Sequence, residues 1–185
     1  MNGFPFMELP QFLSSDQLQQ LKEYVPVSGQ PEPAETRCDG KNAETYHTSW
    51  LDHPNLRFTF DAYMKGLSSV GDNFGYVTHP VEQASYNVYN IYRAPDGGYP
   101  WHIDARSDFV FLDIKMTLIV NASTEPYEGG ELHLAHHTVN DTHLKFMDEP
   151  GNAVLFRSHS LHRVMPVTKG ERRSLTFFFT GPRWR

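Results

Sequence analysis

The chain has 185 residues, of which 39% are hydrophobic, 14% aromatic and 21% charged. This length and composition are typical of one globular domain and exclude an intrinsically disordered chain. The net charge of −6 disfavours a nucleic-acid-binding surface. A single cysteine, Cys38, excludes an internal disulfide and favours a reducing compartment.

The first residues lack the basic region and the long apolar run of a signal peptide. No apolar stretch approaches the roughly 20 residues that are needed to span a bilayer. These features predict a soluble, cytoplasmic protein that has no membrane contact.

Two helices are predicted in the N-terminal part, after a short strand. Residues 4–13 predict a short strand that leads into a turn. Ser14 and Gln17 have the spacing of a capping box, which predicts a helix over 15–25. Apolar residues at helical spacing predict a second helix over 54–69.

The rest of the chain is rich in short β-type stretches that are separated by turns. The predicted strands cover residues 86–92, 99–104, 109–120, 132–134, 153–156, 162–167 and 173–180. Strands of this length and spacing indicate a sandwich or a jelly roll. We therefore expect a single domain over 1–185, mainly β within an α+β arrangement, with a helical part over about 1–80 and a β core over about 84–181.

His102 and Asp104 form a His-x-Asp triplet. On a β-strand, residues i and i+2 point to the same face, so an imidazole and a carboxylate at this spacing can bind one metal ion from one side. The chain contains 10 histidines, so chance alone can produce such a triplet. Other residues must support the metal interpretation.

A later histidine supplies that support. His162 follows Asp104 by 58 residues and lies on a predicted strand. Two histidines and one carboxylate make the facial triad that binds Fe(II) on one face and leaves three coordination positions open. His159, three residues earlier, is the alternative third ligand.

Two arginines follow His162 at a distance of 10 and 11 residues. On a strand, Arg172 shares a face with Ser174 and Thr176, whereas Arg173 points to the opposite face. A guanidinium next to hydroxyl groups is suited to hold a carboxylate by charge-assisted hydrogen bonds. Arg172 is the favoured anchor and Arg173 the alternative.

Over about residues 84–181 the sequence resembles the Fe(II)- and 2-oxoglutarate-dependent oxygenases, within them the prolyl-4-hydroxylase-like branch. Four segments carry this resemblance, in the family's order and at its spacing. They are Tyr92 through Gly97-Gly98 and Tyr99 to His102-Ile103-Asp104; Glu128-Gly129-Gly130-Glu131-Leu132; Pro150-Gly151-Asn152-Ala153-Val154-Leu155-Phe156; and His162-Arg163-Val164 with Pro166, Gly170 and Arg172.

The resemblance implies a double-stranded β-helix (jelly-roll) core and a set of roles. His102, Asp104 and His162 match the iron ligands. Arg172 matches the residue that pairs with the C5 carboxylate of 2-oxoglutarate. Further co-substrate contacts are expected from Tyr92, Ser174, Thr176 and Leu118.

The resemblance also implies the reaction. We expect hydroxylation of an unactivated C–H bond in a peptidyl residue such as proline, or in a small molecule such as a free amino acid. O₂ and 2-oxoglutarate would be consumed, succinate and CO₂ released, and ascorbate would serve as reductant. Asp104 favours hydroxylation, because halogenating relatives have a small residue at the carboxylate position.

There are two alternatives, of which the first is still an enzyme and the second is from another class. Oxidative demethylation of nucleic acid is disfavoured by the negative charge and by the lack of a second arginine motif beyond Arg172. A non-catalytic jelly roll that binds a metal or ligand is disfavoured because it has no physical need for all of His102, Asp104, His162 and Arg172.

Residues near the triad are predicted to meet the substrate. Specificity in such folds lies on loops, so the proline-containing stretch 26–46, predicted to be irregular, and residues 105–110 are candidates. The individual candidates are Tyr99, Trp101, Arg106 and Asp108. A second group, His133, His136 and His137, has metal-binding chemistry but is interpreted as surface or hydrogen-bonded histidines.

Overall fold

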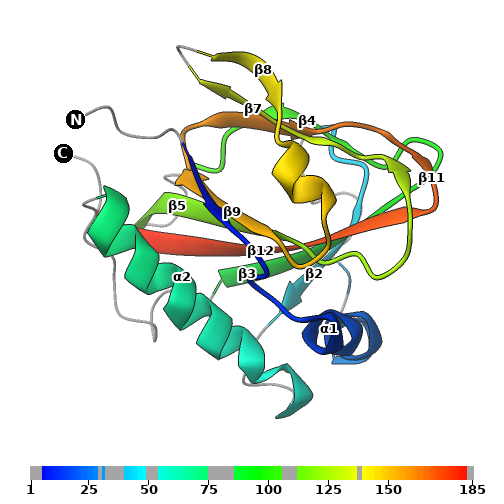
Figure 1. Ribbon diagram of the computed structural model, residues 1–185, viewed down its shortest axis with the longest axis horizontal. Coiled ribbons are helices and arrows are strands. Elements are labelled where there is room, and N and C mark those ends of the chain that lie inside the picture. Colours follow the sequence, from blue (N-terminus) through cyan, green and yellow to red (C-terminus); the bar gives the residue numbers. More distant parts are fainter. Residues whose placement is uncertain are drawn as a thin grey trace.

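The computed structural model describes residues 6–28, 31, 40–48, 54–74, 86–105, 112–136 and 139–182. Figure 1 shows three layers: a small sheet, a large sheet in the middle, and two helices on its far side. No helix in these ranges is both long and apolar enough to cross a membrane. The elements are β1 (Phe6–Leu9), α1 (Ser15–Ser28), β2 (Glu44–Thr48), η2 (Pro54–Leu56), α2 (Phe58–Phe74), β3 (Tyr86–Arg93), β4 (Tyr99–His102), β5 (Leu112–Asn121), β6 (Glu128–Gly129), β7 (Leu132–His136), β8 (Val139–His143), η4 (Lys145–Asp148), β9 (Ala153–Arg157), β10 (Leu161–Val164), β11 (Val167–Lys169) and β12 (Glu171–Pro182).

The first helix begins at the predicted capping box. The backbone N–H of Ser14 donates to Oε1 of Gln17 at 2.9 Å, and the backbone N–H of Gln17 donates to Oγ of Ser14 at 3.3 Å. This reciprocal pair satisfies two N–H groups at the helix start. Helix α2 begins at Phe58, after the short 3₁₀ turn η2, and so starts four residues later than predicted.

The two main sheets are antiparallel, as in a jelly roll. The large sheet has the order β1-β9-β5-β12-β3-β2, and the small sheet has the order β4-β10-β7-β8. The prediction of a mainly β jelly roll with helices before it is therefore confirmed. Residues 44–46, predicted as part of a loop, instead form β2 at the sheet edge by pairing with β3. This pairing is a long-range contact that local composition does not predict.

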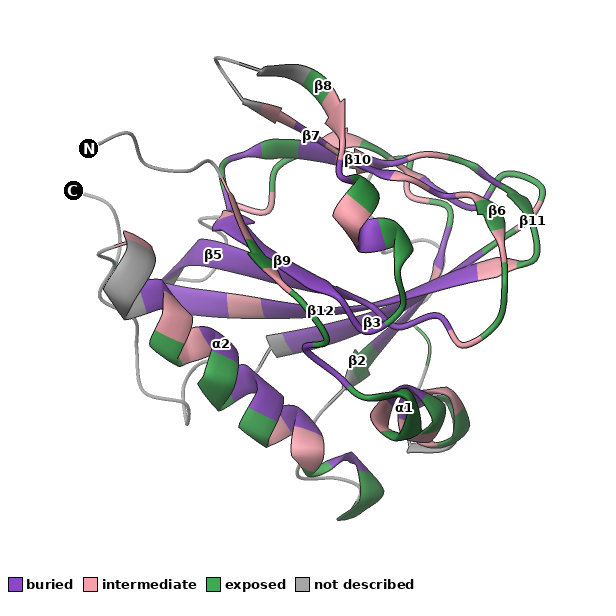
Figure 2. Cartoon of the chain, in the orientation of Figure 1, coloured by how far each residue is buried: buried purple, intermediate pink, exposed green. Residues whose placement is uncertain are grey.

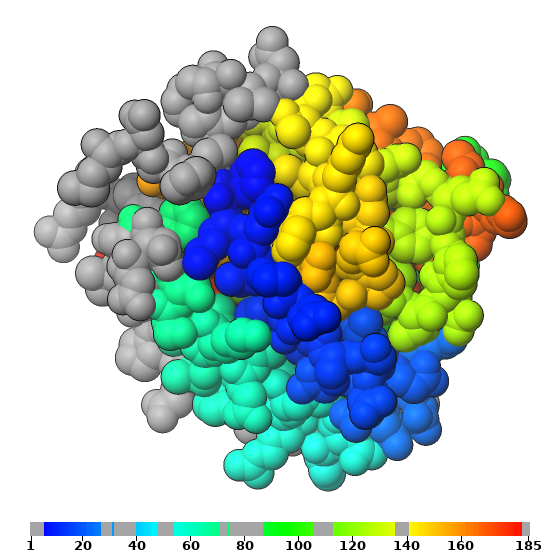
Figure 3. All heavy atoms as spheres, viewed as in Figure 1, coloured from blue at the N-terminus to red at the C-terminus, as the bar shows by residue number. Residues whose placement is uncertain are grey.

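Strand β1 covers the other edge of the large sheet. It pairs with β9, with Phe6 opposite Phe156 and Leu9 opposite Ala153. Figure 3 shows β1, in blue, on the surface between α2 and the yellow segment around η4. A strand of only four residues leaves little open edge for another chain to pair with.

Two apolar clusters lie on opposite faces of the large sheet. Figure 2 shows the buried strands between the small sheet and the helices. The helix-side cluster includes Phe12, Leu21, Tyr63, Met116, Leu118, Leu175, Phe177 and Phe179. The cluster between the sheets includes Ile119, Leu132, Leu134, Val154, Phe156 and Val164. The large sheet is thus buried on both faces.

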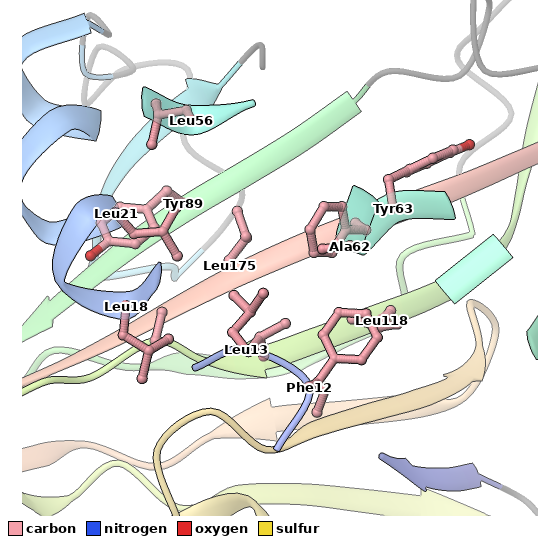
Figure 4. Close-up of a cluster of buried hydrophobic side chains, with 14 of the residues drawn as sticks. Phe12, Leu13, Leu18, Leu21, Leu56, Ala62, Tyr63, Tyr89, Leu118 and Leu175 are labelled. Carbon is pink, nitrogen blue, oxygen red and sulfur yellow. The ribbon is translucent and has the colours of Figure 1, made fainter. Parts of the chain in front are cut away.

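Leu118 belongs to the helix-side cluster. It is fully buried, and Figure 4 shows it in the same group of side chains as Phe12 and Leu175. Its neighbour Ile119 lies on the other face of β5, in the cluster between the sheets. The prediction that Leu118 lines the co-substrate wall is therefore wrong, because one step along a strand changes the face.

The placement of Leu118 predicts a stability defect. Leu118→Ala should lower the free energy of unfolding by about 2–5 kcal/mol, because it opens a cavity in a fully packed core. Urea unfolding checks this, with Leu118→Met as the volume-conserving control. Weaker 2-oxoglutarate binding with unchanged stability would instead place Leu118 at the co-substrate.

Candidate active site

A cavity of about 130 Å³ lies between the two sheets. It receives side chains from β2, β3, β5 and β12 of the large sheet and from β4 and β10 of the small sheet. The residues that line it are Lys41, Thr45, His47, Val88, Asn90, Tyr92, Tyr99, His102, Asp104, Ile114, Ile119, His162, Val164, Arg172, Ser174, Thr176 and Phe178.

The two candidate histidine ligands come from paired strands. In the β4–β10 ladder, His162 lies directly opposite His102, and the centroids of the two rings are 4.1 Å apart. Residues opposite one another on antiparallel strands point to the same face. The strand pairing alone therefore brings together two imidazoles that are 60 residues apart in the chain.

Backbone hydrogen bonds, rather than strand pairing, position Asp104. Strand β4 ends at His102, so the same-face rule that predicted the His-x-Asp pair does not reach Asp104. Instead, the backbone N–H groups of Asp104 and Ala105 both donate to the carbonyl oxygen of Ser158, at 2.8 and 3.0 Å. These hydrogen bonds tie the segment after β4 to the turn between β9 and β10.

The three side chains converge at one point. Oδ1 of Asp104 lies 3.7 Å from Nε2 of His102, and Oδ2 lies 3.3 Å from Nε2 of His162. One ligand atom from each residue lies within 4.8 Å of the others. His159, the alternative to His162, is exposed in the turn between β9 and β10 and is not in this group.

Each candidate ligand has a hydrogen-bond partner behind it. Nδ1 of His102 lies 2.8 Å from the carbonyl oxygen of Pro100, and Nδ1 of His162 lies 3.0 Å from that of Ser160. A carbonyl oxygen can only accept a hydrogen bond, so Nδ1 of each imidazole must carry a hydrogen and donate it. Such partners fix the ring orientation and direct Nε2 towards a metal.

Burial and charge shift the pKa of each of the three candidate ligands. Burial, together with the charge of His162, lowers the pKa of His102 to about 4, so this imidazole is neutral at pH 7. Burial also disfavours charge on His162, but the Asp104 carboxylate outweighs this effect and raises the pKa of His162. The reverse interaction lowers the pKa of Asp104 in spite of its burial. A divalent cation that binds here replaces the His162 proton.

Arg172 enters the same cavity from β12. It is only 1% exposed, and neither Nη1 nor Nη2 has a hydrogen-bond partner among the described residues. The guanidinium lies 5.5 Å from the ring centroid of Tyr92. Gly130 leaves room for this side chain, because a Cβ there would lie 2.9 Å from Cδ of Arg172. Gly130 also has a φ of +72°, which favours glycine.

Arg173 lies on the opposite face of β12. Its guanidinium donates to Glu171 and lies 3.4 Å from the hydroxyl of Tyr89. The face expected for Arg172, shared with Ser174 and Thr176, therefore lines the cavity, whereas Arg173 is engaged in a separate ion pair.

The predicted co-substrate residues Tyr92, Ser174 and Thr176 also line the cavity. Burial raises the pKa of Tyr92 to about 12, so its hydroxyl remains a hydrogen-bond donor at neutral pH. Sequence reasoning missed Asn90, which accepts a hydrogen bond from Thr45 at 3.0 Å in this cavity. Asn90 lies two residues before Tyr92, so strand alternation alone could have predicted that it points to the same face. Its hydrogen bond with Thr45 could not be predicted without knowing that β2 pairs with β3.

The substrate candidates separate into three groups. Tyr99 lines the cavity, and its ring stacks on His102 with centroids 3.5 Å apart. Trp101 does not line the cavity; the guanidinium of Arg163 lies over its ring at 4.6 Å. The register shift in the β4–β10 pairing puts Tyr99 and His102 on one face and leaves Trp101 outside the cavity, so a substrate contact of Trp101 stays a prediction. Arg106 and Asp108 lie outside the described residues, as do the rest of 106–110 and residues 29–30 and 32–39 of the stretch 26–46.

The second histidine group is not assembled as a metal site in the described ranges. Nδ1 of His133 lies 2.6 Å from Asp141, and its ring stacks on His143 with centroids 5.5 Å apart. The side chain of His136 and all of His137 lie outside the described residues. Among described residues, the only group of three potential ligands within binding distance is His102, Asp104 and His162.

The cavity fits a metal ion together with an anionic co-substrate. Two neutral nitrogen donors and one carboxylate are the donor set of non-haem Fe(II) oxygenases. A buried cation with unpaired donors costs free energy unless an anion satisfies it. Arg172 therefore fits a carboxylate bound in the same cavity as the metal.

Comparison with known proteins agrees with this geometry. The family model of the 2OG-Fe(II) oxygenase superfamily matches residues 85–180. A PKHD-type hydroxylase of Alteromonas mediterranea is 33% identical over 114 residues, which cover 57% of this chain and 48% of the relative. A PKHD-type hydroxylase of Sphingopyxis alaskensis is 38% identical over 60 residues, which cover 32% of this chain and 26% of the relative. The chain thus spans between a quarter and a half of the length of these curated relatives.

Solved structures show the same fold. A prolyl-4-hydroxylase from Pseudomonas putida superposes with a TM-score of 0.75 at 19% identity, covering 98% of this chain and 94% of that one. A viral collagen prolyl hydroxylase from Paramecium bursaria chlorella virus 1, in complex with 2OG, gives a TM-score of 0.68 at 16% identity, with 98% of both chains covered. The match of the family model over more than half of the chain shows that this protein belongs to the 2OG-Fe(II) oxygenase superfamily.

Proposed function

We propose that the protein is an Fe(II)- and 2-oxoglutarate-dependent hydroxylase. The observation that carries this proposal is the union of two features in one cavity: a two-histidine, one-carboxylate group, and a buried guanidinium whose terminal nitrogens have no partner among the described residues. The first feature alone would fit any divalent metal, and the second alone would fit any small anion. Together they match one metal and one bound anion, such as a carboxylate of 2-oxoglutarate.

The metal would be held by Nε2 of His102, Nε2 of His162 and the carboxylate of Asp104. The carbonyl groups of Pro100 and Ser160 hold the two Nδ1–H groups, so the rings keep their orientation without a metal. Three ligands on one side leave coordination positions for the co-substrate and O₂.

The co-substrate would lie between this group and Arg172. The guanidinium would pair with the distal carboxylate of 2-oxoglutarate, and the Tyr92 hydroxyl, which stays protonated, would donate a further hydrogen bond. Ser174 and Thr176 line the same wall. The apolar side chains of Ile119 and Val164 exclude water around the aliphatic part.

When bound, Fe(II) and 2-oxoglutarate supply the oxidising chemistry, with O₂ as oxidant and with succinate and CO₂ as co-products. The protein's own contribution is to orient and to shield. Strands β3, β4, β10 and β12 hold Tyr92, His102, His162 and Arg172 on a rigid framework, whereas Asp104 follows β4 and is held by the turn between β9 and β10.

The substrate would approach where the cavity reaches the surface. Most lining residues are buried, and those that retain exposure mark the rim: Lys41, His47, Tyr99, His102, Asp104 and Phe178. Tyr99, stacked on His102, is the predicted contact that lies on this rim. A peptidyl residue such as proline, or a small molecule such as an amino acid, would present its C–H bond there, and ascorbate would act as reductant.

Three observations bear on the class of substrate. The curated relatives above are named hydroxylases, and a prolyl hydroxylase from Trichoplax adhaerens, with a TM-score of 0.68, is in complex with a peptide fragment of hypoxia inducible factor. The net charge of −6 disfavours nucleic acid as substrate. We propose a cytoplasmic location on the basis of the single cysteine.

Purified protein should convert 2-oxoglutarate to succinate when Fe(II), ascorbate and O₂ are present. Succinate is measured with and without proline-containing peptides and free amino acids, and a true substrate should raise the rate. The control is protein treated with a chelator. Failure to form succinate with every candidate, together with no Fe(II)-dependent absorption on addition of 2-oxoglutarate, would refute the proposal.

The metal assignment is tested by two histidines in the same segment. His162→Ala should weaken Co(II) binding by more than about 100-fold, because loss of a direct ligand exceeds the loss of an outer partner. His159→Ala should leave Co(II) affinity unchanged, because His159 is exposed and outside the group. Titration of metal-free protein measures both, and equal effects of the two variants would contradict the assignment.

The two adjacent arginines provide a matched test of the co-substrate anchor. Arg172→Met should weaken 2-oxoglutarate binding to Co(II)-loaded protein by about 30-fold or more, because it removes a buried cation from a charge pair. Arg173→Met should keep the affinity but lower stability, because it breaks the contacts with Glu171 and Tyr89. The reverse pattern of affinities would assign the anchor to Arg173.

A further inference from the structure

Asp104 is the one candidate ligand that lies beyond the end of its strand, and a buried threonine holds its carboxylate. Thr117, on β5, donates a hydrogen bond from Oγ1 to Oδ2 of Asp104 at 2.8 Å. Thr117 is fully buried and belongs to none of the segments that carry the family resemblance. It faces the space between the sheets, next to the site, because it alternates with the helix-side residues Met116 and Leu118.

A second hydroxyl stands behind Thr117. Oγ1 of Thr117 lies 3.2 Å from Oγ of Ser158, which is also fully buried. A threonine hydroxyl has one proton, and the carboxylate is both the nearer and the stronger acceptor. The proton of Thr117 therefore goes to Asp104, and the Ser158 hydroxyl donates to Thr117.

Ser158 also holds the backbone of Asp104. Its carbonyl oxygen accepts the N–H groups of Asp104 and Ala105, and its own N–H donates to the carbonyl oxygen of Lys115. The same turn thus fixes the main chain of Asp104 directly and its side chain through Thr117. This arrangement replaces the strand pairing that positions His102 and His162.

We propose that Thr117 is a positioning residue of the metal site. Its hydroxyl sets the rotation of the Asp104 carboxylate so that the two oxygens face the two imidazoles before a metal binds. The carbonyl groups of Pro100 and Ser160 do the same for the histidines, so all three ligands are held from behind. This inference rests on the metal site of the proposed function.

The test compares Thr117→Val with Thr117→Ser. Valine has nearly the shape of threonine but no hydroxyl, whereas serine keeps the hydroxyl. Thr117→Val should weaken Co(II) binding to metal-free protein by about 10- to 100-fold. It should also change the Co(II) absorption spectrum, because the carboxylate is free to rotate. Thr117→Ser should restore both the affinity and the spectrum.

Urea unfolding of the metal-free variants separates positioning from packing. A merely structural role predicts lower stability of Thr117→Val with unchanged Co(II) affinity and spectrum, and that result would overturn the proposal. If Thr117→Val does not fold, Thr117→Cys gives the same comparison, because a thiol is only a weak donor. Wild-type protein that binds no Co(II) would instead refute the metal site itself, and the role of Thr117 with it.

Discussion

The antiparallel pairing of β12 with β3 and β5 decides which side chains reach the cavity and which reach the apolar core. Ser174 lies opposite Asn90 on one side and Asn121 on the other, and this register continues along the strand. Because side chains alternate, one face presents Arg172, Ser174 and Thr176 to the cavity, and the other packs Leu175, Phe177 and Phe179 under the helices. A slip of one residue would turn Ser174 and Thr176 into the apolar core and Leu175 and Phe177 into the cavity.

This register buries the guanidinium of Arg172, and the burial costs free energy. Removing a cation from water costs several kcal/mol, and in the described part of the chain the ring of Tyr92 is only a partial compensation. The fold tolerates this cost because both faces of the sheet are otherwise apolar and well packed. A bound carboxylate would accept the hydrogen bonds that the guanidinium loses on burial. The unsatisfied guanidinium therefore favours the binding of an anion.

The three candidate metal ligands are positioned in two different ways. Strand pairing places His102 opposite His162 with no loop involved. Asp104 depends on hydrogen bonds from a turn and from Thr117, because its own strand has already ended. The three ligands therefore meet only when β4, β5 and the turn between β9 and β10 are packed together. Two residues on the rim of the cavity, Lys41 and His47, belong neither to the small sheet nor to the ligand group.

Local sequence features determined much of this protein. The capping box at Ser14, the strand-rich C-terminal part and the shared face of Arg172, Ser174 and Thr176 follow from residue type and spacing, because these properties are local. The choice of His162 over His159 came from the resemblance to the oxygenase family. Tertiary structure decided the rest. The edge strand β2, the inward position of Ile119 instead of Leu118, the outward position of Trp101 and the support of Asp104 by Thr117 depend on long-range pairing, on a register shift and on hydrogen bonds between distant segments. No local pattern specifies which partner a strand or a hydroxyl will meet, since that choice is made only when the sheets pack together.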